Sequence, residues 1–469
     1  MQVGDILDDL SLDVATSSVE VTRVENDSRA CTPGTLFFAM PGAARHGASF
    51  VLDAVTRGAS CVVADAPLRA TVPVVVVPST QLNGLLAHAS ATIVGHPESK
   101  VKLVGVTGTN GKTSVSTIVA SLARALSWNA SSIGTLTGER TTPAAPELYR
   151  SLARDVAAFD PERKKSLIAL EVSSHALDQR RVEGLRFCVA AFTNLSHDHL
   201  DYHHTMEEYF AAKASLFTPE YAKRAVVWVD DEYGARLADA TSVPVTRVTR
   251  DEARDVVNSL QGSTFFWRGH LVNSALAGDY NVDNALMAMA ILSTLGAPDG
   301  EIASAMGEVE GVAGRFDVLH GGGVTVVIDY AHSPKGLERL LRDVRSLQGG
   351  GRLITVFGAG GDRDRAKRPE MGRVASALSD VVVVTSDNPR SESPEAIIDA
   401  VIAGVVAGTD ARRVSDRREA IAAALEEARS GDVVVIAGKG HESTITIGED
   451  VLPFSDRRVA QELMRGASC

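Results

Sequence analysis

Short apolar runs recur along the chain, and segments with helical spacing separate them. A run of about four to eight residues that is apolar at nearly every position is typical of a strand buried on both faces. Alternation of such strands with helices predicts an α/β fold with parallel, doubly wound sheets. In the middle and last parts of the chain, the predicted strands are 101–106, 167–172, 189–193, 324–328, 353–357, 381–385 and 433–437.

The pattern is interrupted twice, which predicts three domains. The stretch Gly95-His-Pro-Glu-Ser99 is typical of a linker, and the pattern restarts after Gly311-Val-Ala-Gly-Arg315. A chain of 469 residues fits this number, because domains usually have about 100–200 residues. The expected domains are 1–98, with strands at 36–39, 61–64 and 72–77; 99–312, closed by a helix at 281–294; and 313–469.

Composition and charge limit the kinds of binding partner that the chain is expected to have. Apolar residues make up 45% of the chain, and 47 basic against 59 acidic residues give a net charge of −12. Such an acidic chain is not expected to bind nucleic acid or an anionic membrane. The four cysteines lack metal spacing and fit a reducing compartment. Because the N-terminus is acidic and no apolar run approaches the roughly 18 residues of a membrane helix, we expect a cytoplasmic protein.

The most specific motif lies where the strand at 101–106 ends. Gly108-Thr-Asn-Gly111 follows it, and a helix with Lys112 and Thr113 at its start comes next. Loop amides and the positive helix end can cradle phosphate oxygens, while Lys112 meets the β/γ charge and Thr113 can bind Mg²⁺. The spacing departs from a standard P-loop, because Val106 stands where its first glycine should be. The alternative, a tight turn without nucleotide, gives Lys112 no reason to be there.

Two segments further along carry charged or histidine-rich strand ends. Glu171 is a charge in the otherwise apolar strand 167–172, at the sheet edge where α/β folds bind ligands. A buried acid needs a cation, which could be Mg²⁺ shared with Thr113 or the arginine of a salt bridge. The loop after 189–193 is dense in histidine as far as His204. Zinc is one interpretation, without a supporting motif, and ordinary polar loop residues are the other.

Lys213 lies among small and apolar residues in a predicted helix, Glu208 to Phe217. Burial disfavours an ammonium group, so a neutral amine at this position could react with CO₂ and become an anionic carbamate that binds metal. Most lysines in such helices instead extend to water. From the residues alone, both alternatives stay open.

Together these motifs give the chain a resemblance to the Mur ligase family, the ATP-dependent amide-forming enzymes of peptidoglycan precursor synthesis. The resemblance covers essentially the whole chain and is closest to the members that add the third residue of the stem peptide. It implies an N-terminal uridine-nucleotide-binding domain, a central P-loop-type ATPase domain and a C-terminal Rossmann-like domain for the incoming amino acid. The matching motifs are Thr107-Gly-Thr-Asn-Gly-Lys-Thr113, Glu171-Val-Ser-Ser-His175, Asp198-His-Leu-Asp-Tyr-His203, Lys213, Asp279-Tyr-Asn-Val-Asp-Asn284, Gly314-Arg315, Asp329-Tyr-Ala-His-Ser-Pro-Lys335 and Gly438-Lys-Gly-His-Glu442.

The resemblance implies the cofactors ATP and Mg²⁺ and assigns their residues. Lys112, Lys213 and His199 would be catalytic. Thr113 and Glu171 would hold one Mg²⁺, and His199 with a carbamylated Lys213 a second. The ATP contacts would come from Gly108, Thr109, Asn110, Gly111, Lys112, Thr113, Ser114, Asn284, Arg315 and Asp329.

The implied substrates are UDP-N-acetylmuramoyl-dipeptide and meso-diaminopimelate. The segment Asn26-Asp-Ser-Arg29 (Ser28 most specifically) and the 41–47 loop match the uridine-nucleotide site. The muramoyl-dipeptide would be held by Thr141, Thr142, Ser173, Gln179 and Arg181. The incoming amino acid would be held by Arg363, Asp387, Asn388, Pro389, Arg390, Gly438 and Glu442.

The last set suits a ligand end with both carboxylate and ammonium. An arginine can fork the carboxylate and Glu442 can pair the ammonium. Three loops at the carboxyl ends of parallel strands are expected to converge here. Read alone, Asp387 to Arg390 is equally well explained as a plain turn. Lysine-adding relatives lack the arginine, so the resemblance favours meso-diaminopimelate.

Three departures lie on the nucleotide-sugar side. The hairpin between Leu136 and Thr141 is cut to Thr-Gly-Glu-Arg, Arg140 replaces the family's Asn, and His46 stands where Asp is common. These changes put substrate affinity or identity in doubt rather than the type of reaction. A Mur-type ligase with another amino acid or acceptor is therefore an alternative, as are a folylpolyglutamate synthase, a P-loop kinase or GTPase, and an inactive paralogue. We expect a monomer.

Overall fold

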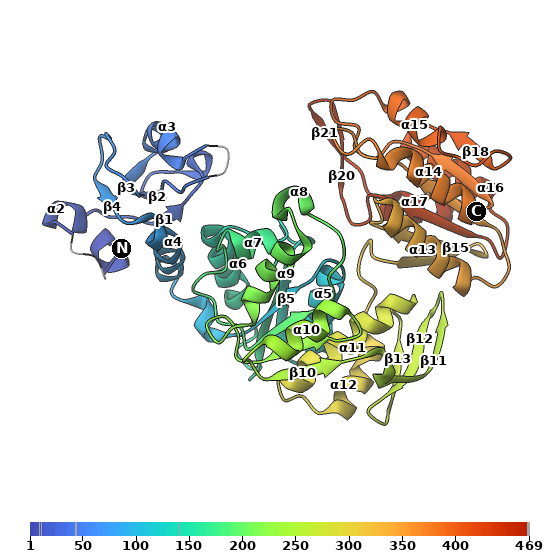
Figure 1. The fold of residues 1–469 in the computed structure, drawn as a ribbon, viewed down its shortest axis with the longest axis horizontal. Helices are drawn as coiled ribbons and strands as arrows, with labels where there is room; N and C mark the ends of the chain where they lie inside the picture. The colour runs from blue at the N-terminus through green and yellow to red at the C-terminus, as the bar shows by residue number, and fades with distance from the viewer. Residues whose placement is uncertain (9, 11, 43–44, 139, 467–469) are drawn as a thin grey trace. The chain divides into compact units, whose positions relative to one another are not determined.

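The computed structural model describes residues 1–8, 10, 12–42, 45–138 and 140–466 of the chain (Figure 1). The chain divides into two units with separate internal packing. The first consists of Met1–Thr249 and Met287–Pro298, and the second of Arg250–Leu286 and Asp299–Cys469.

The first unit begins with a four-stranded parallel sheet in the order β1-β2-β3-β4. The three predicted strands are confirmed as β2 (Thr35–Phe38), β3 (Ala59–Ala64) and β4 (Val74–Val76), whereas the short, charged β1 (Arg23–Glu25) has no apolar run to reveal it. The helices of this segment are α1 (Val3–Ile6), α2 (Val14–Ser17), α3 (Val51–Thr56) and α4 (Ser79–Ile93), and the 3₁₀ turns are Ser28–Ala30, Gly47–Phe50 and Pro97–Lys100.

A six-stranded parallel sheet in the order β10-β9-β8-β5-β7-β6 forms the rest of the first unit. β5 (Lys102–Thr107) lies between β8 (Val189–Phe192) and β7 (Ser166–Glu171), so the strand order reverses at β5, where α/β sheets bind ligands. The other strands are β6 (Asn129–Ile133), β9 (Ala225–Trp228) and β10 (Val245–Val248). The helices are α5 (Lys112–Ala125), α6 (Ala145–Ala157), α7 (Ser174–Asp178), α8 (Leu200–His203), α9 (Met206–Ala214) and α10 (Glu232–Ala240).

One hydrophobic core runs through both sheets of the first unit. Leu86 on α4 and Leu148 and Leu152 on α6 belong to the same buried cluster, which also contains Leu36 of β2 and Ile168 of β7. The apolar faces of α4 and α6 therefore join the N-terminal segment to the central sheet.

The second unit opens with an antiparallel sheet that the sequence did not predict. It consists of β11 (Ala253–Ser259), β12 (Gly262–Trp267) and β13 (His270–Ser274), paired in chain order. Each strand carries only two or three adjacent large apolar residues among polar ones, so they contain no long apolar run. α11 (Asp279–Thr294) follows and confirms the helix predicted at 281–294; α12 (Asp299–Ala305) comes next.

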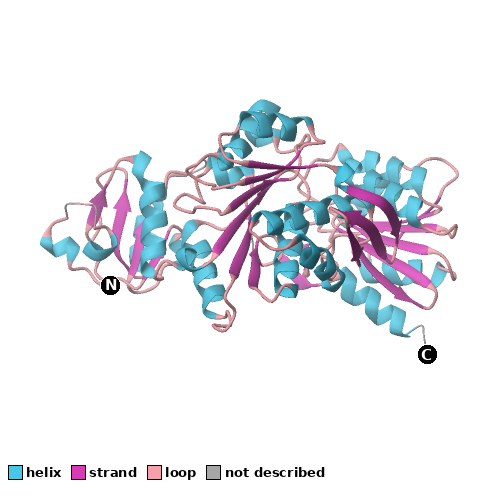
Figure 2. Ribbon diagram, turned by 90° about the horizontal axis from the view of Figure 1, so that it is seen from below, coloured by secondary structure: helices cyan, strands magenta, loops and turns pink. Residues whose placement is uncertain are grey.

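The C-terminal sheet has six strands in the order β14-β15-β19-β16-β17-β18, parallel except for β14. Helices cover both faces of this sheet, and a separate hydrophobic cluster lies between the helices and the sheet on each face (Figure 2). The four predicted strands are confirmed as β15 (Val324–Asp329), β16 (Leu353–Phe357), β17 (Val381–Val384) and β19 (Val433–Ala437). The other elements are β14 (Asp317–Gly321), β18 (Asp410–Arg413), the hairpin β20 (Thr444–Ile447) and β21 (Asp450–Pro453), and helices α13 (Pro334–Leu347), α14 (Lys367–Leu378), α15 (Pro394–Ile402), α16 (Arg417–Glu427) and α17 (Asp456–Gly466).

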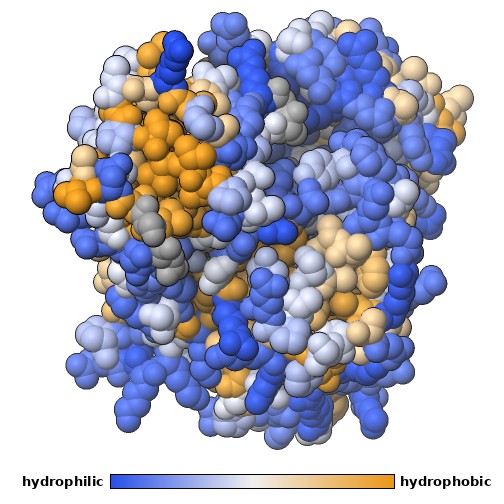
Figure 3. Space-filling model, turned by 60° about the vertical axis from the view of Figure 1, so that its left-hand side comes forward, coloured by the Kyte–Doolittle hydropathy of each residue, from blue (hydrophilic) through white to orange (hydrophobic). Residues whose placement is uncertain are grey.

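The surface mixes hydrophilic and apolar areas. On the face shown in Figure 3, hydrophilic residues cover most of the surface and apolar side chains gather mainly in one area. No helix within the described part of the chain is both long and apolar enough to cross a membrane.

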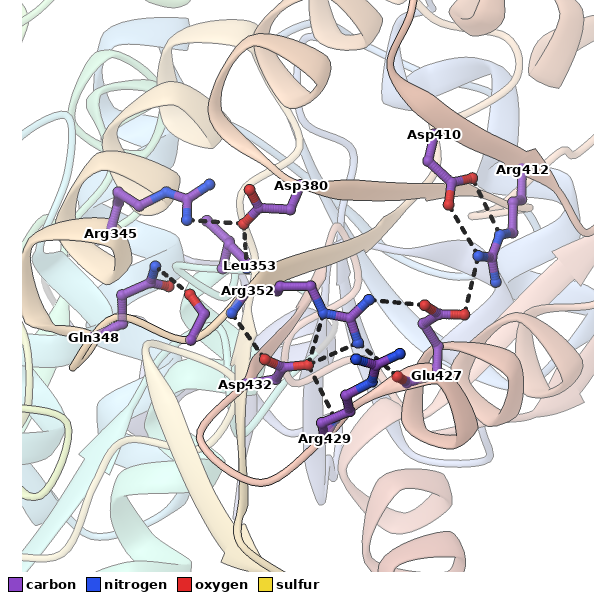
Figure 4. Close-up of polar contacts among 11 residues, drawn as sticks. Arg345, Gln348, Arg352, Leu353, Asp380, Asp410, Arg412, Glu427, Arg429 and Asp432 are labelled. Carbon is purple, nitrogen blue, oxygen red and sulfur yellow. Dashed lines mark hydrogen bonds and ion pairs between the residues drawn. The ribbon is translucent and has the colours of Figure 1, made fainter.

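Ion pairs tie the strand starts of the C-terminal sheet together (Figure 4). Arg352, just before β16, donates through Nη1 to Glu427 Oε1 at 2.8 Å and through Nε to Asp432 Oδ2 at 3.1 Å. Asp432 precedes β19 and also accepts the Arg352 amide at 2.8 Å. Asp380, before β17, accepts the Leu353 amide at 2.7 Å. This network lies at the amino ends of the strands, opposite the edge where the candidate site is expected.

Candidate active site

The loop after β5 has the backbone that a phosphate cradle needs. Gly108 has φ +146°, and a Cβ there would collide with Thr193 Oγ1. Gly111 has φ +85° and caps the N-terminus of α5. Both positions therefore require glycine, and the loop directs the first turn of α5, with its N–H groups, toward a ligand.

The loop after β8 braces this cradle, which the sequence did not reveal. The Thr109 amide donates to Asn194 O at 2.9 Å, and the Asn110 amide donates to Asn194 Oδ1 at 3.0 Å. Thr193 Oγ1 donates to Asn110 O at 2.6 Å. Thr193 and Asn194 follow directly after a strand adjacent to β5, and this position is the only signal by which they could have been found.

Two lysine ammonium groups converge on the carbonyl of Gly108. Lys112 Nζ donates to Gly108 O and Thr109 O, both at 2.9 Å, and Lys213 Nζ donates to Gly108 O at 2.7 Å. Lys213 is only 1% exposed, so the alternative in which it extends to water is wrong. Burial, and secondarily the charge of Lys112, lower the pKa of Lys213 well below its usual value. The Lys213 amine is thereby shifted toward its neutral form.

Glu171 lies at the end of β7 with hydroxyl groups around it. It is 2% exposed; Oε2 accepts from Thr113 Oγ1 at 2.9 Å, and Oε1 accepts from the Thr135 amide at 2.8 Å. Within the described part of the chain no arginine pairs with it, so the salt-bridge alternative is wrong. A buried carboxylate beside a hydroxyl at a phosphate loop fits Mg²⁺, which prefers such oxygen ligands.

Histidine rings gather beside this site. His175 lies 5.0 Å from His199 and 5.4 Å from His203, between ring centroids. Burial lowers the pKa of His199, and the nearby charges of Lys112 and Lys213 act in the same direction. A neutral imidazole is the form that binds metal. The described residues contain no group of three or more His, Cys, Asp or Glu arranged to hold a metal ion, so the zinc interpretation finds no support.

The predicted dipeptide-binding residues form one polar network that reaches Glu171. Thr142 Oγ1 donates to the Glu171 carbonyl at 2.9 Å and accepts the Ser173 amide at 3.0 Å. Arg181 donates through Nη1 to Thr142 O at 3.0 Å and through Nη2 to Gln179 Oε1 at 2.6 Å. Thr141 joins the network through Thr135, with 3.1 Å between their hydroxyl oxygens.

The predicted uridine-site residues lie in the N-terminal segment. Ser28 starts a 3₁₀ turn, is buried, and its hydroxyl bonds the Asp53 carboxylate, which lowers the pKa of Asp53. His46 accepts the Ala48 amide through Nδ1 at 3.1 Å and contacts Asp65 Oδ2 through Nε2 at 3.1 Å. His46 therefore has a structural role as a cap, in place of the usual Asp. Residues 43–44 of the 41–47 loop and residue 139 of the shortened hairpin lie outside the described residues.

In the second unit, two of the predicted ATP-side residues, Arg315 and Asp329, lie beside Tyr330, whereas no contact of Asn284 with them is found among the described residues. The Arg315 guanidinium lies 4.5 Å from the centre of the Tyr330 ring, and its Nε is buried with no hydrogen-bond partner among the residues that the structure describes. Asp329 accepts the amides of Phe316 and Ala331, both at 2.8 Å, and burial raises its pKa. Asn284 lies on α11, where its side chain donates to Asn281 Oδ1 at 3.1 Å.

The three C-terminal loops converge as predicted. The Gly361 amide donates to Asn388 O at 2.9 Å, which joins the loops after β16 and β17. Asn388 Nδ2 donates to Glu442 Oε2 at 2.9 Å, which joins the loops after β17 and β19. Gly438 has φ +116°, and a Cβ there would lie 2.9 Å from Asp387 Oδ2. The half-buried Arg390 donates through Nη1 to Gly361 O at 2.6 Å, whereas Arg363 is exposed.

Two features of the converging C-terminal loops were not predicted from the sequence. Lys439 is fully buried, and its Nζ donates to Glu442 Oε2 at 2.8 Å. The hairpin β20–β21 holds the loop after β17: the Arg390 amide donates to Thr446 O at 3.1 Å, and the Gly448 amide donates to Arg390 O at 2.7 Å. The hairpin could have been predicted from the glycine in the turn after β20. Nothing in the sequence indicates which residue pairs with Lys439.

Comparison with known proteins identifies the family in which this arrangement occurs. Residues 20–103 match the Mur ligase family, catalytic domain; residues 106–292 match the Mur ligase middle domain; and residues 314–440 match the Mur ligase, glutamate ligase domain. The UDP-N-acetylmuramoyl-L-alanyl-D-glutamate–2,6-diaminopimelate ligase of Gloeobacter violaceus is 40% identical over 488 residues, which cover 99% of this chain and 98% of the relative. This chain belongs to the Mur ligase family. The ligase of the same name from Streptomyces avermitilis is 40% identical over 478 residues, covering 95% of this chain and 93% of the relative.

Solved structures agree with this family and its three-domain fold. A structure of UDP-N-acetylmuramoyl-L-alanyl-D-glutamate–2,6-diaminopimelate ligase matches this Mur ligase with a TM-score of 0.70 and 29% identity, covering 100% of this chain and 99% of that chain. MurF ligase from Thermotoga maritima, in complex with ADP, shares the fold at a TM-score of 0.63 and 16% identity, covering 95% and 97% of the two chains. As a Mur ligase, the chain is an enzyme of the ligase class.

Proposed function

We propose that this Mur ligase joins meso-2,6-diaminopimelate to UDP-N-acetylmuramoyl-L-alanyl-D-glutamate and converts ATP to ADP and phosphate. The observation that carries the proposal is the convergence of three loops that bring Arg390 and Glu442 to one end of the C-terminal sheet. Opposite charges at one place suit an amino-acid end that carries both carboxylate and ammonium. The names of relatives at 40% identity over nearly the whole chain support the same substrates.

In the first step, the γ-phosphoryl group of ATP passes to a carboxylate of the dipeptide and forms an acyl phosphate. The cradle from Gly108 to Ser114 would hold the phosphates, with Lys112 close to the transferring group. Thr113 and Glu171 would hold one Mg²⁺, and His199 with modified Lys213 a second; such ions neutralise charge on the phosphoryl group. Arg181, with Gln179 and Thr142, would orient the dipeptide carboxylate.

In the second step, the amine of the amino acid attacks the acyl carbon. The tetrahedral intermediate loses phosphate, and the amine nitrogen loses its proton as the amide forms. Arg390 would fork the distant carboxylate of diaminopimelate, and Glu442 would pair the distant ammonium. L-lysine has no distant carboxylate, so Arg390 would remain unpaired with it, which is the physical basis of selectivity.

We infer that Lys213 is carbamylated in the active enzyme. A neutral amine attacks CO₂, forms an N–C bond and releases a proton, which gives an anionic carbamate. The burial of Lys213 and the lowering of its pKa favour the neutral amine that this reaction needs. The two carbamate oxygens could then bind metal, which an ammonium cannot do because it has no lone pair.

The remaining proposals concern the location, the oligomeric state and the binding partners of the enzyme. We propose that it works in the cytoplasm as a monomer, without stable membrane association or nucleic-acid binding. Sedimentation at enzyme concentrations used in assays tests the monomer, and a stable dimer would contradict it.

Phosphate release from ATP tests the reaction directly. The assay contains the nucleotide-dipeptide and, in separate reactions, meso-diaminopimelate, L-lysine and other amino acids. We expect release only when an acceptor and diaminopimelate are both present. Phosphate release with a different amino acid, and not with diaminopimelate, would instead support a related Mur ligase. Release with a folate acceptor would support a folylpolyglutamate synthase. The folylpolyglutamate synthase of Mycobacterium tuberculosis shares the fold at a TM-score of 0.57, with 20% identity, covering 75% of this chain and 91% of that chain.

A further inference from the structure

Lys439 is a buried lysine in the amino-acid part of the candidate site. Its Nζ lies 2.8 Å from Glu442 Oε2, 3.1 Å from Asn388 Oδ1 and 3.8 Å from Asp387 Oδ1. Its side chain is 0% exposed, whereas that of Glu442 is 30% exposed. Lys439 therefore contacts its protein partners, and Glu442 is the group of this cluster that a ligand can reach.

A second buried cation fixes the two loops that carry these groups. Arg417, at the start of α16, pairs with Asp456 through Nε–Oδ1 at 2.7 Å and Nη2–Oδ2 at 2.8 Å, and both side chains are fully buried. The same guanidinium donates to Ser386 O and to Ala437 O, both at 3.0 Å. Arg417 thus spans the ends of β17 and β19, and its charge is matched by Asp456.

Of the three carboxylates in this cluster, Glu442 is the one that a ligand can pair. Arg417 pairs with Asp456, and Lys439 contacts both Asp387 and Glu442, while the charge of Lys367 also acts on Asp387. Glu442 is partly exposed, and its Oε1 has no hydrogen-bond partner among the described residues. A ligand ammonium can therefore pair with Glu442 at Oε1.

We propose that Lys439 is a positioning residue that fixes Glu442 and Asn388 for the ammonium group of the incoming amino acid. By binding Glu442 Oε2, Lys439 leaves Oε1 for the ligand. Together with the Thr446 amide, which donates to Asn388 Oδ1 at 3.0 Å, Lys439 also sets which side of the Asn388 amide faces Glu442, since Asn388 Nδ2 must then donate to Oε2. The inference rests on the proposed function in placing the amino acid here, but Lys439 acts on whichever ammonium ligand the site takes.

The role of Lys439 has a consequence for pH dependence. Burial alone would raise the pKa of Glu442, and the hydrogen bond and charge of Lys439 outweigh burial and lower it. Without Lys439 the pKa of Glu442 rises, so binding of an ammonium is lost as the pH falls through that raised value. The charged and titratable groups that act on Glu442, or on which it acts, are Lys439, His441, Asp387, Arg417 and Tyr330.

The test compares Lys439→Met with wild type in the full enzyme, with meso-diaminopimelate as the varied substrate. We expect KM for diaminopimelate to rise at least about tenfold while kcat changes less than about threefold, because a ground-state contact is lost. KM for ATP stays at the wild-type value. The acid limb of the KM profile moves to higher pH, which a merely structural role of Lys439 would not cause.

A double-mutant cycle isolates the contact. If Lys439 acts through Glu442, Lys439→Met changes KM for diaminopimelate in the wild-type background but adds little in a Glu442→Gln background. Lys439→Arg keeps the charge, so its acid limb should stay near that of wild type. Lys439→Gln removes the charge but keeps a hydrogen-bond donor, and it carries the test, with the same expected shift to higher pH, if Lys439→Met does not fold. Fully additive effects, or equal acid limbs in wild type and Lys439→Met, would overturn the proposal.

Arg352→Met is the matched control. It removes a cation from an ion-pair network of the same sheet, at the amino ends of the strands (Figure 4). We expect a lower melting temperature with an unchanged KM profile. If wild type does not use diaminopimelate, the proposed substrate is wrong; the same comparison with the amino acid that wild type uses still decides the role of Lys439.

Discussion

At the scale of single residues, Lys112 is expected to matter for chemistry and little for folding. Its Nζ contacts the carbonyls of Gly108 and Thr109 at the loop edge, and its removal takes no apolar group from the core. Lys112→Ala should lower kcat by at least about a thousandfold, as loss of charge stabilisation does in phosphoryl transfer. Retention of a tenth of wild-type amide formation, with an unchanged circular dichroism melt, would contradict the assigned role.

Lys213 allows a test by chemical rescue. Lys213→Ala should be nearly inactive and partly restored by acetate, whose oxygens can replace those of the carbamate. Lys213→Arg should not be restored, because the guanidinium fills the space with permanent positive charge. Carbon-13 NMR in labelled bicarbonate, or native mass measurement, should detect the carbamate in wild type; an unmodified lysine in fully active enzyme would refute it.

A substitution at Glu171 distinguishes a metal ligand from a purely structural carboxylate. Its carboxylate accepts hydrogen bonds from Thr113 and Thr135, which an amide oxygen can partly preserve. Glu171→Gln should therefore fold but need a much higher Mg²⁺ concentration for half-maximal rate, since a neutral amide is a weaker ligand for a hard cation. An unchanged Mg²⁺ requirement would remove Glu171 from the metal site.

At the scale of elements, the ion-pair network at the start of β16 and β19 is expected to serve stability. Arg352→Ala removes the cation that holds Glu427 and Asp432, and should lower Tm by about 2–5 °C while kcat stays near wild type. Burial opposes ionisation of Asp432, but hydrogen bonds from the Arg429 amide and from the Arg352 amide and side chain outweigh it and lower the pKa of Asp432 below that of the unfolded chain. The stabilisation is therefore present above the unfolded pKa and is lost as pH falls, so the Tm difference should shrink in acid.

The central strands could be predicted from sequence because they are mostly apolar on both faces. The phosphate loop could be predicted because its two glycines are followed by lysine and threonine at the start of a helix. The edge strands could not. β6 (Asn129–Ile133) and β18 (Asp410–Arg413) lie at sheet edges, where half-exposed strands carry polar residues and show no apolar run. The antiparallel strands β11–β13 have only two or three adjacent large apolar residues each, so they also lack the apolar run by which a strand is predicted.

Contacts between distant loops were equally hidden. The position of Lys439 in a glycine-rich motif suggested no role, because its partners Asn388 and Asp387 lie about fifty residues away in sequence and meet it only when β17 and β19 occupy one sheet. Thr193 and Asn194 bracing the phosphate loop are a second example. Sequence motifs identified the groups that would touch ligands, while the groups that hold them in place became visible only in the fold.

At the scale of the whole molecule, the chain is a Mur ligase whose assigned functions fall into two sets. Residues of the first unit carry the phosphate loop and the proposed dipeptide contacts. Residues of the second unit carry the proposed amino-acid contacts and the ATP-side residues Asn284, Arg315 and Asp329. Because Arg390 is not among the proposed ATP contacts, Arg390→Ala should destroy amino-acid selectivity and leave ATP affinity unchanged. Calorimetric titration of the variant with an ATP analogue checks the second half of this prediction.

The selectivity of the wild-type enzyme between meso-diaminopimelate and L-lysine tests the central claim most directly. The measurement is kcat/KM for each amino acid with saturating ATP and nucleotide-dipeptide. We predict a preference for diaminopimelate of at least about a hundredfold. Lysine leaves the half-buried Arg390, which a bound ligand would cover, without a carboxylate partner, at a cost of roughly 3 kcal/mol or more. Equal use of the two amino acids would contradict the account of the amino-acid site.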